Sequence, residues 1–388
     1  MLALSPRARS VAYRFGTERR LPSLLRFVGT AALSGLALSS GIAAAQDSTK
    51  QVAASAFFES QNPIEVTLTT NINGIRSDKT QNPPWRLATI TYKGAEGNLV
   101  TVPLRARTRG IWRLRMCEFP PLRLNFSEAT SKGTVFHLLD KPKLVSYCHN
   151  MDSHEQYILQ EYQLYRIYQV LTPVSHKARL LRVVYADSAD RKVRATRYAF
   201  ITEEPGALAT RLGGTLIEQH GARPGDLDSF QDALFGVFQY FIGNTDFSEA
   251  GLHNVELLLT TDGVVKPIAY DFDFAGAVNA RYAVADATLG IPNVRQRLFR
   301  GYCLDPESYA KAIAVFQEKK SQIYALYSDS IGMLMDRGTA RETLRYFDDF
   351  YRTVDDKRAV KRSLVAACIR PTEGPPTRSV TRSNPSPN

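Results

Sequence analysis

The chain has 388 residues and a formal net charge of +11, and 44% of its residues are hydrophobic. These values predict an ordinary globular core in one large domain or two lobes, and they exclude a chain too polar to fold. Six Arg and one Glu in the first 45 residues supply +5 of the charge, so +6 remains beyond them. This remainder is scattered among carboxylates without a basic stripe or an RNA-binding signature, so we expect no nucleic-acid partner.

The first 45 residues have the pattern of an export signal. Arg residues precede an apolar run of small residues from Phe27 to Ala45, which ends in an Ala-x-Ala cleavage pattern before Gln46. We interpret residues 1–45 as a signal peptide, with a retained anchor as the alternative. The mature protein would then be periplasmic, extracellular or associated with the envelope. No later stretch has the ~18 consecutive apolar residues of a membrane-spanning helix.

Export would place the four cysteines in an oxidising compartment. Cys117, Cys148, Cys303 and Cys368 allow three disulfide pairings. Their order favours Cys117–Cys148 with Cys303–Cys368, because each bridge then staples one half of the chain. None has the spacing of a zinc site.

The first half of the mature chain is predicted to be rich in strands. Residues 46–61 are polar and are interpreted as a flexible tether. Alternating apolar residues between 64 and 102, separated by Gly, Asn, Asp and Pro, indicate antiparallel strands. Further strands are expected at 122–126, 143–145, 180–185 and 197–201. One prominent helix interrupts them, with Ser153 and Gln156 as a capping box at its start and Thr172-Pro173 at its end.

The second half is predicted to be mainly helical. A helix begins near Asp226 and is capped by Gly243, and a hairpin joins 255–259 to 264–270. Beyond Asp305 the pattern is helical to residue 369, and the Pro-rich end, 371–388, is expected to be disordered. The fold class expected is therefore α+β. A β-rich part, 62–204, is joined near residues 203–205 to a helical part, 205–370.

Three short segments carry the clearest chemistry. Gly243-Asn244-Thr245-Asp246 places a carboxylate just beyond a helix, and His253-Asn254 begins a strand. Asp271-Phe272-Asp273 follows an apolar strand. Phosphoryl-transfer enzymes use such groups in this order: one carboxylate orients the attacking hydroxyl, and an Asn with a strand-end carboxylate holds the metal ion. The alternatives are an Asx turn at Asp246, a structural His253 and two solvated carboxylates at a hairpin tip.

Cations that suit phosphates precede these segments. Arg105, Arg107 and Arg109 alternate and so share one face of a strand that ends at Gly110. Lys143 opens a later strand, and Glu161 lies on a face of the prominent helix rich in Tyr and Leu. A half-buried Glu needs a positive partner, and we expect a Lys143–Glu161 pair like that of kinases. Ordinary surface charges are the alternative reading.

These segments resemble the spore-coat-protein-H (CotH-like) family of atypical kinases. The similarity covers about residues 100–300 and lies in the following stretches: residues 107–110, residues 120–126, the segment around Lys143, residues 198–204, residues 243–246, His253-Asn254 and residues 270–273. The sequence departs from the family pattern at Phe247, where Trp is usual, and at residues 111–117, where small residues and Lys are usual.

The resemblance implies a two-lobed kinase-like fold that binds ATP with Mg²⁺ or Mn²⁺. It implies the role of catalytic carboxylate for Asp246, metal ligation by Asn254 and Asp271, and a phosphate contact by Lys143. To these the residue pattern itself adds His253 as a catalytic residue and Asp273 as a metal ligand. The further predicted nucleotide-binding residues are Arg107, Arg109, Glu161 and Glu203. The acceptor would be a hydroxyl on a protein, such as an envelope protein, or on a small molecule.

Two other functions fit parts of the sequence. Asp271-Phe272-Asp273 is also the D-x-D arrangement with which glycosyltransferases hold a metal on a nucleotide sugar, although a parallel βαβ series is missing near the N-terminus. A catalytically inactive envelope protein could keep the same cluster for structure or for calcium. Other templates fail, because the chain has no G-x-S-x-G, no G-x-x-x-x-G-K-[ST], no G-x-G-x-x-G and no H-E-x-x-H.

Overall fold

The structure is a computed structural model that describes residues 56–370, and these residues belong to one compact unit. The predicted signal peptide, the first ten residues of the predicted tether and the predicted tail lie outside the described residues. Residues 56–59, the next part of that tether, form a helical turn in which Phe57 and Phe58 are buried. The ordered fold therefore begins before the first strand.

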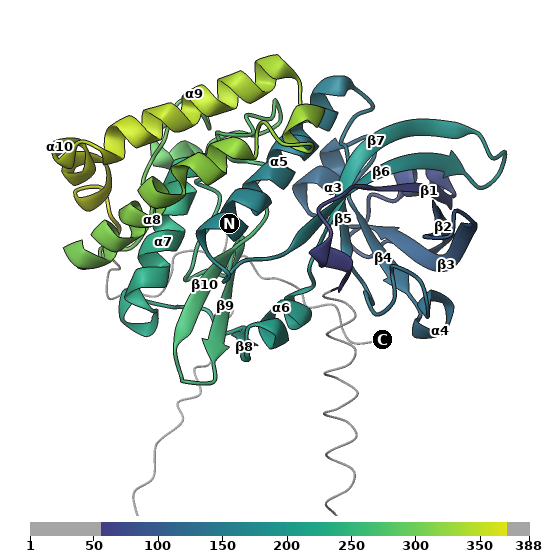
Figure 1. Ribbon diagram of the computed structural model, residues 1–388, viewed down its shortest axis with the longest axis horizontal. Helices are drawn as coiled ribbons and strands as arrows, with labels where there is room; N and C mark the ends of the chain where they lie inside the picture. Colours follow the sequence, from purple (N-terminus) through teal and green to yellow (C-terminus); the bar gives the residue numbers. More distant parts are fainter. Residues whose placement is uncertain (1–55, 371–388) are drawn as a thin grey trace, which may run out of the picture. The chain divides into compact units, whose positions relative to one another are not determined.

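Seven strands form a closed barrel in the order β1-β2-β3-β4-β5-β7-β6 (Figure 1). β1 and β6 close it as a parallel pair, with Ile64 opposite Leu181, and the other neighbours are antiparallel. The strands are β1 (Ile64–Thr70), β2 (Arg86–Lys93), β3 (Leu99–Thr108), β4 (Leu122–Phe126), β5 (Lys143–Val145), β6 (Ala178–Asp187) and β7 (Val193–Thr202).

Alternation along each strand decides which side chains fill the barrel. On β3, Val102, Leu104 and Ala106 are buried inside, whereas Arg105 and Arg107 lie on the outer face. Short helices connect the strands: α2 (Ile72–Ser77), α3 (Trp112–Met116) and α4 (Glu128–Ser131). A disulfide between Cys117 and Cys148 ties the end of α3 to the segment after β5, as the sequence predicted.

Helices and a small sheet form the remainder, around a second apolar core. The sheet has the order β10-β9-β8. A second disulfide, Cys303–Cys368, confirms the other predicted pairing. No helix within residues 56–370 is long and apolar enough to cross a membrane. The elements are α5 (Asp152–Leu171), α6 (Pro205–Arg211), β8 (Gly214–Ile217), α7 (Ser229–Ile242), β9 (Val255–Thr260), β10 (Val265–Ala269), α8 (Pro306–Ala325), α9 (Arg337–Val354) and α10 (Lys357–Val360).

The expected two-lobed kinase-like fold is wrong. The β-rich half closes into a barrel, because β1 pairs with a strand more than a hundred residues away. The second half contains a three-stranded sheet as well as helices. The prominent helix, α5, was assigned to the β-rich half, yet its Tyr162, Leu164 and Ile167 are fully buried in the same core as α7, α8 and α9.

Local predictions at helix ends met different outcomes. Gly243 caps α7 in the left-handed conformation, with φ of 67°, as predicted. A Cβ at this position would collide with the hydroxyl of Tyr346, so glycine is required for space as well as for backbone geometry. The capping box predicted at Ser153 does not form, because the N-cap of α5 is Met151, two residues earlier, which has no side-chain acceptor.

Candidate functional site

Two paired strand ends bring the central polar residues together. Asn254 precedes β9 and Asp271 follows β10, and the register of these strands sets Val255 opposite Ala269. The backbone amide of Tyr270 donates to the carbonyl of Asn254 at 3.2 Å. Asn254 and Asp271 both have left-handed backbone conformations, with φ of 54° and 63°. Such strain in two adjacent non-glycine residues is typical of functional sites.

Asp246 is held by both residues of the His-Asn pair. His253 Nε2 lies 2.8 Å from Asp246 Oδ1, and Asn254 Nδ2 donates to Asp246 Oδ2 at 3.1 Å. The Asn254 amide also donates to the backbone carbonyl of Asp246 at 2.8 Å. The Asp246 side chain is 42% exposed, so its carboxylate is fixed and still accessible. The structure thus brings the two predicted catalytic residues into contact.

The loop that carries Asp246 is anchored at its start and over its length. Asn244 is fully buried, donates to Gln239 of α7 at 3.0 Å and accepts the backbone amide of Asp246 at 3.0 Å. Arg300 donates to the carbonyls of Thr245 and Phe247. These contacts hold the carboxylate by its backbone, which is the preorganisation that catalysis requires.

The two carboxylates of Asp271-Phe272-Asp273 have different surroundings. Phe272 is fully buried between them, with its ring 4.7 Å from that of Tyr165, which confirms its predicted role as an anchor. The backbone amide of Asp271 donates to the Tyr165 hydroxyl at 2.9 Å, and Asp271 lines a cavity. Asp273 is buried, and its carboxylate lies 3.4 Å from Arg113 Nη1.

Arg113, on α3, takes the position predicted for Lys143. Its Nη1 lies 3.9 Å from the carboxylate of Glu161 on α5, and its Nη2 donates to the carbonyl of Ser146 at 2.9 Å. Burial raises the pKa of Asp273 to about 7; Arg113 opposes this shift, and the Asp271 carboxylate adds to it. Burial and Asp273 raise the pKa of Glu161 well above its usual value. One guanidinium therefore faces two carboxyl groups that resist ionisation.

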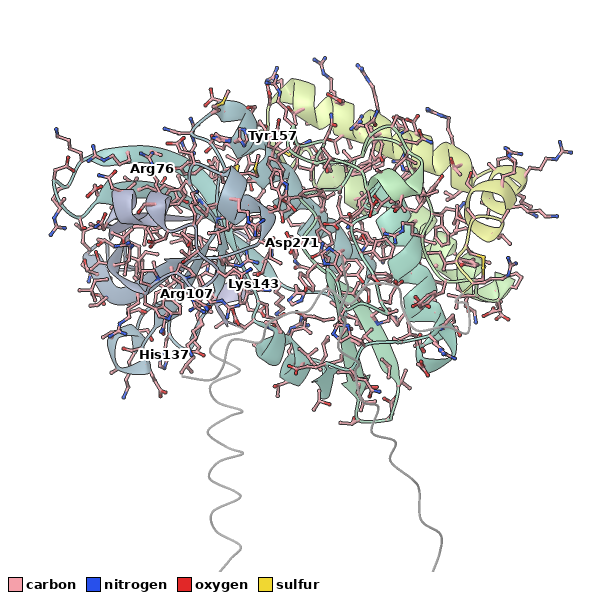
Figure 2. All side chains as sticks on the ribbon, turned by 180° about the vertical axis from the view of Figure 1, so that it is seen from behind. Arg76, Arg107, His137, Lys143, Tyr157 and Asp271 are labelled. Atoms are coloured by element: carbon pink, nitrogen blue, oxygen red, sulfur yellow. A yellow bond between two sulfur atoms is a disulfide. The ribbon has the colours of Figure 1, made fainter. Side chains whose placement is uncertain are left out.

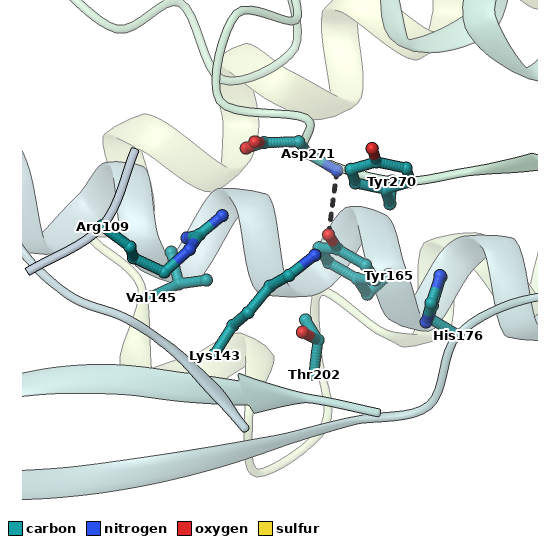
Figure 3. Close-up of a pocket in the computed structure, with 8 residues that line it drawn as sticks. All are labelled: Arg109, Lys143, Val145, Tyr165, His176, Thr202, Tyr270 and Asp271. Atoms are coloured by element: carbon teal, nitrogen blue, oxygen red, sulfur yellow. Dashed lines mark hydrogen bonds between the residues drawn. The ribbon is translucent and has the colours of Figure 1, made fainter. Parts of the chain in front are cut away.

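Lys143 and Arg109 line a small, partly open cavity at the inner end of the site. Figure 3 shows both side chains reaching from the barrel side toward the strand end that bears Asp271. Lys143 Nζ lies 5.0 Å from the centre of the Tyr270 ring. Burial lowers the pKa of both cations. Arg109 lowers the pKa of Lys143 further, whereas Asp271 opposes the shift at Arg109. The lining residues are Arg109, Lys143, Val145, Tyr165, His176, Thr202, Tyr270 and Asp271.

The other predicted nucleotide-binding residues lie outside this cavity. Arg107 stacks over the ring of Trp85 at 4.5 Å on the outer face of the barrel. Glu203 is buried and pairs with Arg211 at 2.7 Å, which is a structural contact. Its neighbour Glu204 faces the cations instead: burial raises the pKa of Glu204, and Arg123 and Lys143 oppose the shift.

A divalent cation would find few ligands in the protein alone. Within the described part of the chain, no cluster of three or more His, Cys, Asp and Glu could hold a metal ion. Asn254 uses its amide nitrogen for Asp246, which leaves Oδ1 as the acceptor of this side chain. One amide oxygen and one carboxylate fit Mg²⁺, which commonly takes its other ligands from phosphates and water. Asp273 is less suited, because it faces Arg113.

Sequence reasoning missed Arg113, Glu204 and Arg123. Arg113 lies in the segment that departs from the family pattern, and only the fold brings it to Glu161. No protein-family model matches the chain, and no curated protein matches it. The roles of these residues are therefore argued from geometry and charge.

Proposed function

We propose that the protein is an exported, metal-dependent phosphotransferase that moves the γ-phosphoryl group of ATP to a hydroxyl, as in the CotH-like kinases that its sequence resembles. The observation that carries the proposal is the Asp246 carboxylate, fixed by His253 and Asn254 at the strand ends. Asp271 adjoins this group on the neighbouring strand and shares a cavity with Arg109 and Lys143.

Asp246 has the properties of a group that orients and deprotonates a hydroxyl. Its carboxylate is accessible, and two side chains fix its direction. His253 contacts Oδ1 and Asn254 donates to Oδ2, so the acceptor hydroxyl would approach the exposed side of a carboxylate whose orientation is fixed. Proton transfer by such a positioned carboxylate contributes typically 10²–10⁴-fold to the rate.

Arg109 and Lys143 would bind the phosphate oxygens. Neither forms an ion pair within residues 56–370, and burial disfavours the charge on both. A polyphosphate supplies the missing negative charge and hydrogen-bond acceptors. Asn254 and Asp271 would hold Mg²⁺ or Mn²⁺, which when bound neutralises phosphate charge. Only Asp271 of the D-x-D pair lines the cavity, and this favours phosphoryl transfer over a glycosyltransferase that uses both carboxylates.

Export is proposed on the signal-like segment together with two observations. The chain forms two disulfides, and no described helix could cross a membrane. Disulfides persist in oxidising compartments. Kinase chemistry there would act on secreted or envelope hydroxyls.

The test is nucleotide turnover by the exported, oxidised protein, followed as ADP release and as transfer of labelled γ-phosphate, with Mg²⁺, with Mn²⁺ and with chelator. We expect metal-dependent turnover that Asp271→Asn abolishes. The same substitution should leave the melting temperature without metal unchanged or slightly higher, since it removes one of two neighbouring carboxylates.

Asp262→Asn is the matched control, because Asp262 is an exposed carboxylate at the other end of the same hairpin. It should leave turnover unaltered. A protein that shows no metal-dependent turnover, or an Asp271→Asn variant that unfolds without metal, would contradict the proposal.

A further inference from the structure

The positive charge of this chain is concentrated in one stretch. Residues 99–145 contain nine Lys and Arg but only three Asp and Glu. This excess of six equals the entire net charge of the chain beyond residue 45, so the rest of that part is balanced. The charge is therefore less scattered than the sequence suggested.

Strand register gathers part of this charge into one area. Arg107 on β3 is opposite Arg123 on β4, and Arg123 is opposite Lys143 on β5. Neighbouring strands lie about 4.8 Å apart, and like charges directly opposite each other are destabilising. Along β3, Arg105 and Arg107 point outward two residues apart and lead to Arg109 at the cavity. We call Arg105, Arg107 and Arg123 the cationic track.

Little negative charge in the protein compensates the track. In the described structure, none of its three residues forms an ion pair with a carboxylate. Arg105 is exposed, and Arg107 stacks on Trp85. Burial and the nearby Arg123 lower the pKa of Arg107. Glu204 is an acidic group near the inner end: burial raises its pKa, and Arg123 opposes this shift.

The track leads to the candidate active site. Figure 2 shows Arg107, Lys143 and Asp271 following one another across one side of the molecule. Arg109 and Lys143 lie inside the cavity, where the proposed function assigns them to nucleotide phosphates. The three cations of the track lie beyond it, and a second anion is needed to explain them.

We propose that the cationic track binds the acceptor, and that this acceptor is an acidic peptide in extended conformation with a hydroxyl residue at its cavity end. This inference rests on the proposed function. Residues two apart on a strand are spaced about 6.6–6.8 Å. Acidic side chains at alternate positions of an extended peptide repeat at the same distance as Arg105 and Arg107, so successive carboxylates can each meet one guanidinium, with Arg123 beside Arg107 on the next strand.

The surroundings of the track favour a peptide over a single-stranded nucleic acid. Leu87, directly opposite Arg105, is 80% exposed, and Leu99 on the same face of β3 is 77% exposed. Apolar side chains beside alternating charges suit a peptide. Binding to single strands requires aromatic rings on which bases stack, whereas the Trp85 ring is already covered by Arg107.

The test measures binding without nucleotide, by fluorescence anisotropy. The probes are a labelled peptide with Asp at alternate positions and Ser between them, a peptide of the same composition with its Asp residues in one block, and a thymidine oligonucleotide of equal charge. The protein is used as wild type, as Arg105→Gln/Arg123→Gln, and as Arg341→Gln/Arg345→Gln. The last pair removes the same charge from exposed positions on α9.

We expect the alternating peptide to bind about tenfold more tightly than the block peptide or the oligonucleotide. Loss of two track cations should weaken it about tenfold, because each exposed ion pair contributes a few-fold, and the α9 variant should bind like wild type. Equal loss in both variants, or preference for the oligonucleotide, would overturn the inference. Specific peptide binding without nucleotide turnover would support peptide binding by the cationic track and contradict the proposed kinase function. Turnover without any preference for acidic peptides would do the reverse.

Discussion

Two groups of charged residues lie one turn apart along helix α5. The first group forms ion pairs, and the second forms none within the described residues. At Glu161, the carboxyl groups of Glu161 and Asp273 share the guanidinium of Arg113. At Tyr165, four residues on, the cations Arg109 and Lys143 share a cavity and no ion pair reaches either within residues 56–370.

This difference distinguishes a charged group that stabilises the fold from one whose counter-charge the described residues do not supply. A buried charge without a partner is costly, so a fold keeps one only where something else supplies the counter-charge. The Arg113 group contains charges of both signs within the protein and joins α3 to α5 and to the strand end. The Arg109–Lys143 group is incomplete within residues 56–370, and in the proposed function a phosphate would complete it. Variants of the two groups should therefore differ in sign as well as in size.

The largest effect is expected from Arg113→Met. Removal of one partner of a buried ion pair costs about 3–5 kcal/mol, because two carboxyl groups lose their cation. The loss should grow as pH rises from 5 to 8, since the pKa of Asp273, already raised to about 7 by burial, would rise further without Arg113. Urea unfolding at both pH values measures it.

Arg352→Met is the matched control for that experiment. Arg352 forms an ion pair with Asp349 on the exposed face of α9, and exposed pairs contribute about 0–1 kcal/mol. If Arg113→Met were as mild as this control at pH 8, the Arg113 group would not hold the site together.

Two buried carboxyl groups elsewhere in the described residues also have oxygen atoms that lack hydrogen-bond partners. Asp232 on α7 and Glu249 on the Asp246 loop are buried, and both oxygens of Asp232 and one of Glu249 lack hydrogen bonds. Burial raises the pKa of Asp232 to about 7, with Asp228 adding to the shift. Burial and Asp232 raise the pKa of Glu249 to about 8.

Asp232→Asn should therefore stabilise the protein at pH 8. Between pH 4 and 7 the unfolded chain loses the Asp232 proton first, so the folded state binds more protons and wild-type stability falls as pH rises. We expect a gain on the order of 2 kcal/mol at pH 8 and none at pH 4. Thermal unfolding across this range gives the answer. A constant difference at every pH would mean that packing, and not ionisation, separates the two proteins.

Local features of this fold could be predicted from the sequence. Gly243 as a cap, the 255–270 hairpin and the anchor Phe272 all depend on neighbours within a few residues. The contact of Asp246 with His253-Asn254 spans eight residues and was predictable for the same reason. Both disulfides followed from residue order, with only three pairings to choose from.

Long-range pairing could not be predicted. Barrel closure joins β1 to β6 across 117 residues, as Ile64 to Leu181, and alternation within a strand does not say which strand it meets. The ion pair of Glu161 was assigned to Lys143 because both lie at expected places on a strand and a helix. Arg113 occupies that position because the Cys117–Cys148 bridge and α3 bring it there.

The smallest effect, and the one that tests the comparison most directly, is expected from Lys143→Met. Methionine keeps most of the length of the side chain and its contact with Tyr270, and it removes a charge that burial and Arg109 disfavour. Removal of an uncompensated cation should stabilise the protein by less than about 1 kcal/mol.

The same variant should lose binding of Mg-ATP in calorimetry, because the counter-charge to the phosphates is gone. Lys132→Met, at an exposed position after α4, should change neither quantity. A loss of more than about 2 kcal/mol in Lys143→Met would make Lys143 a structural residue like Arg113, and the two groups along α5 would then serve the same purpose.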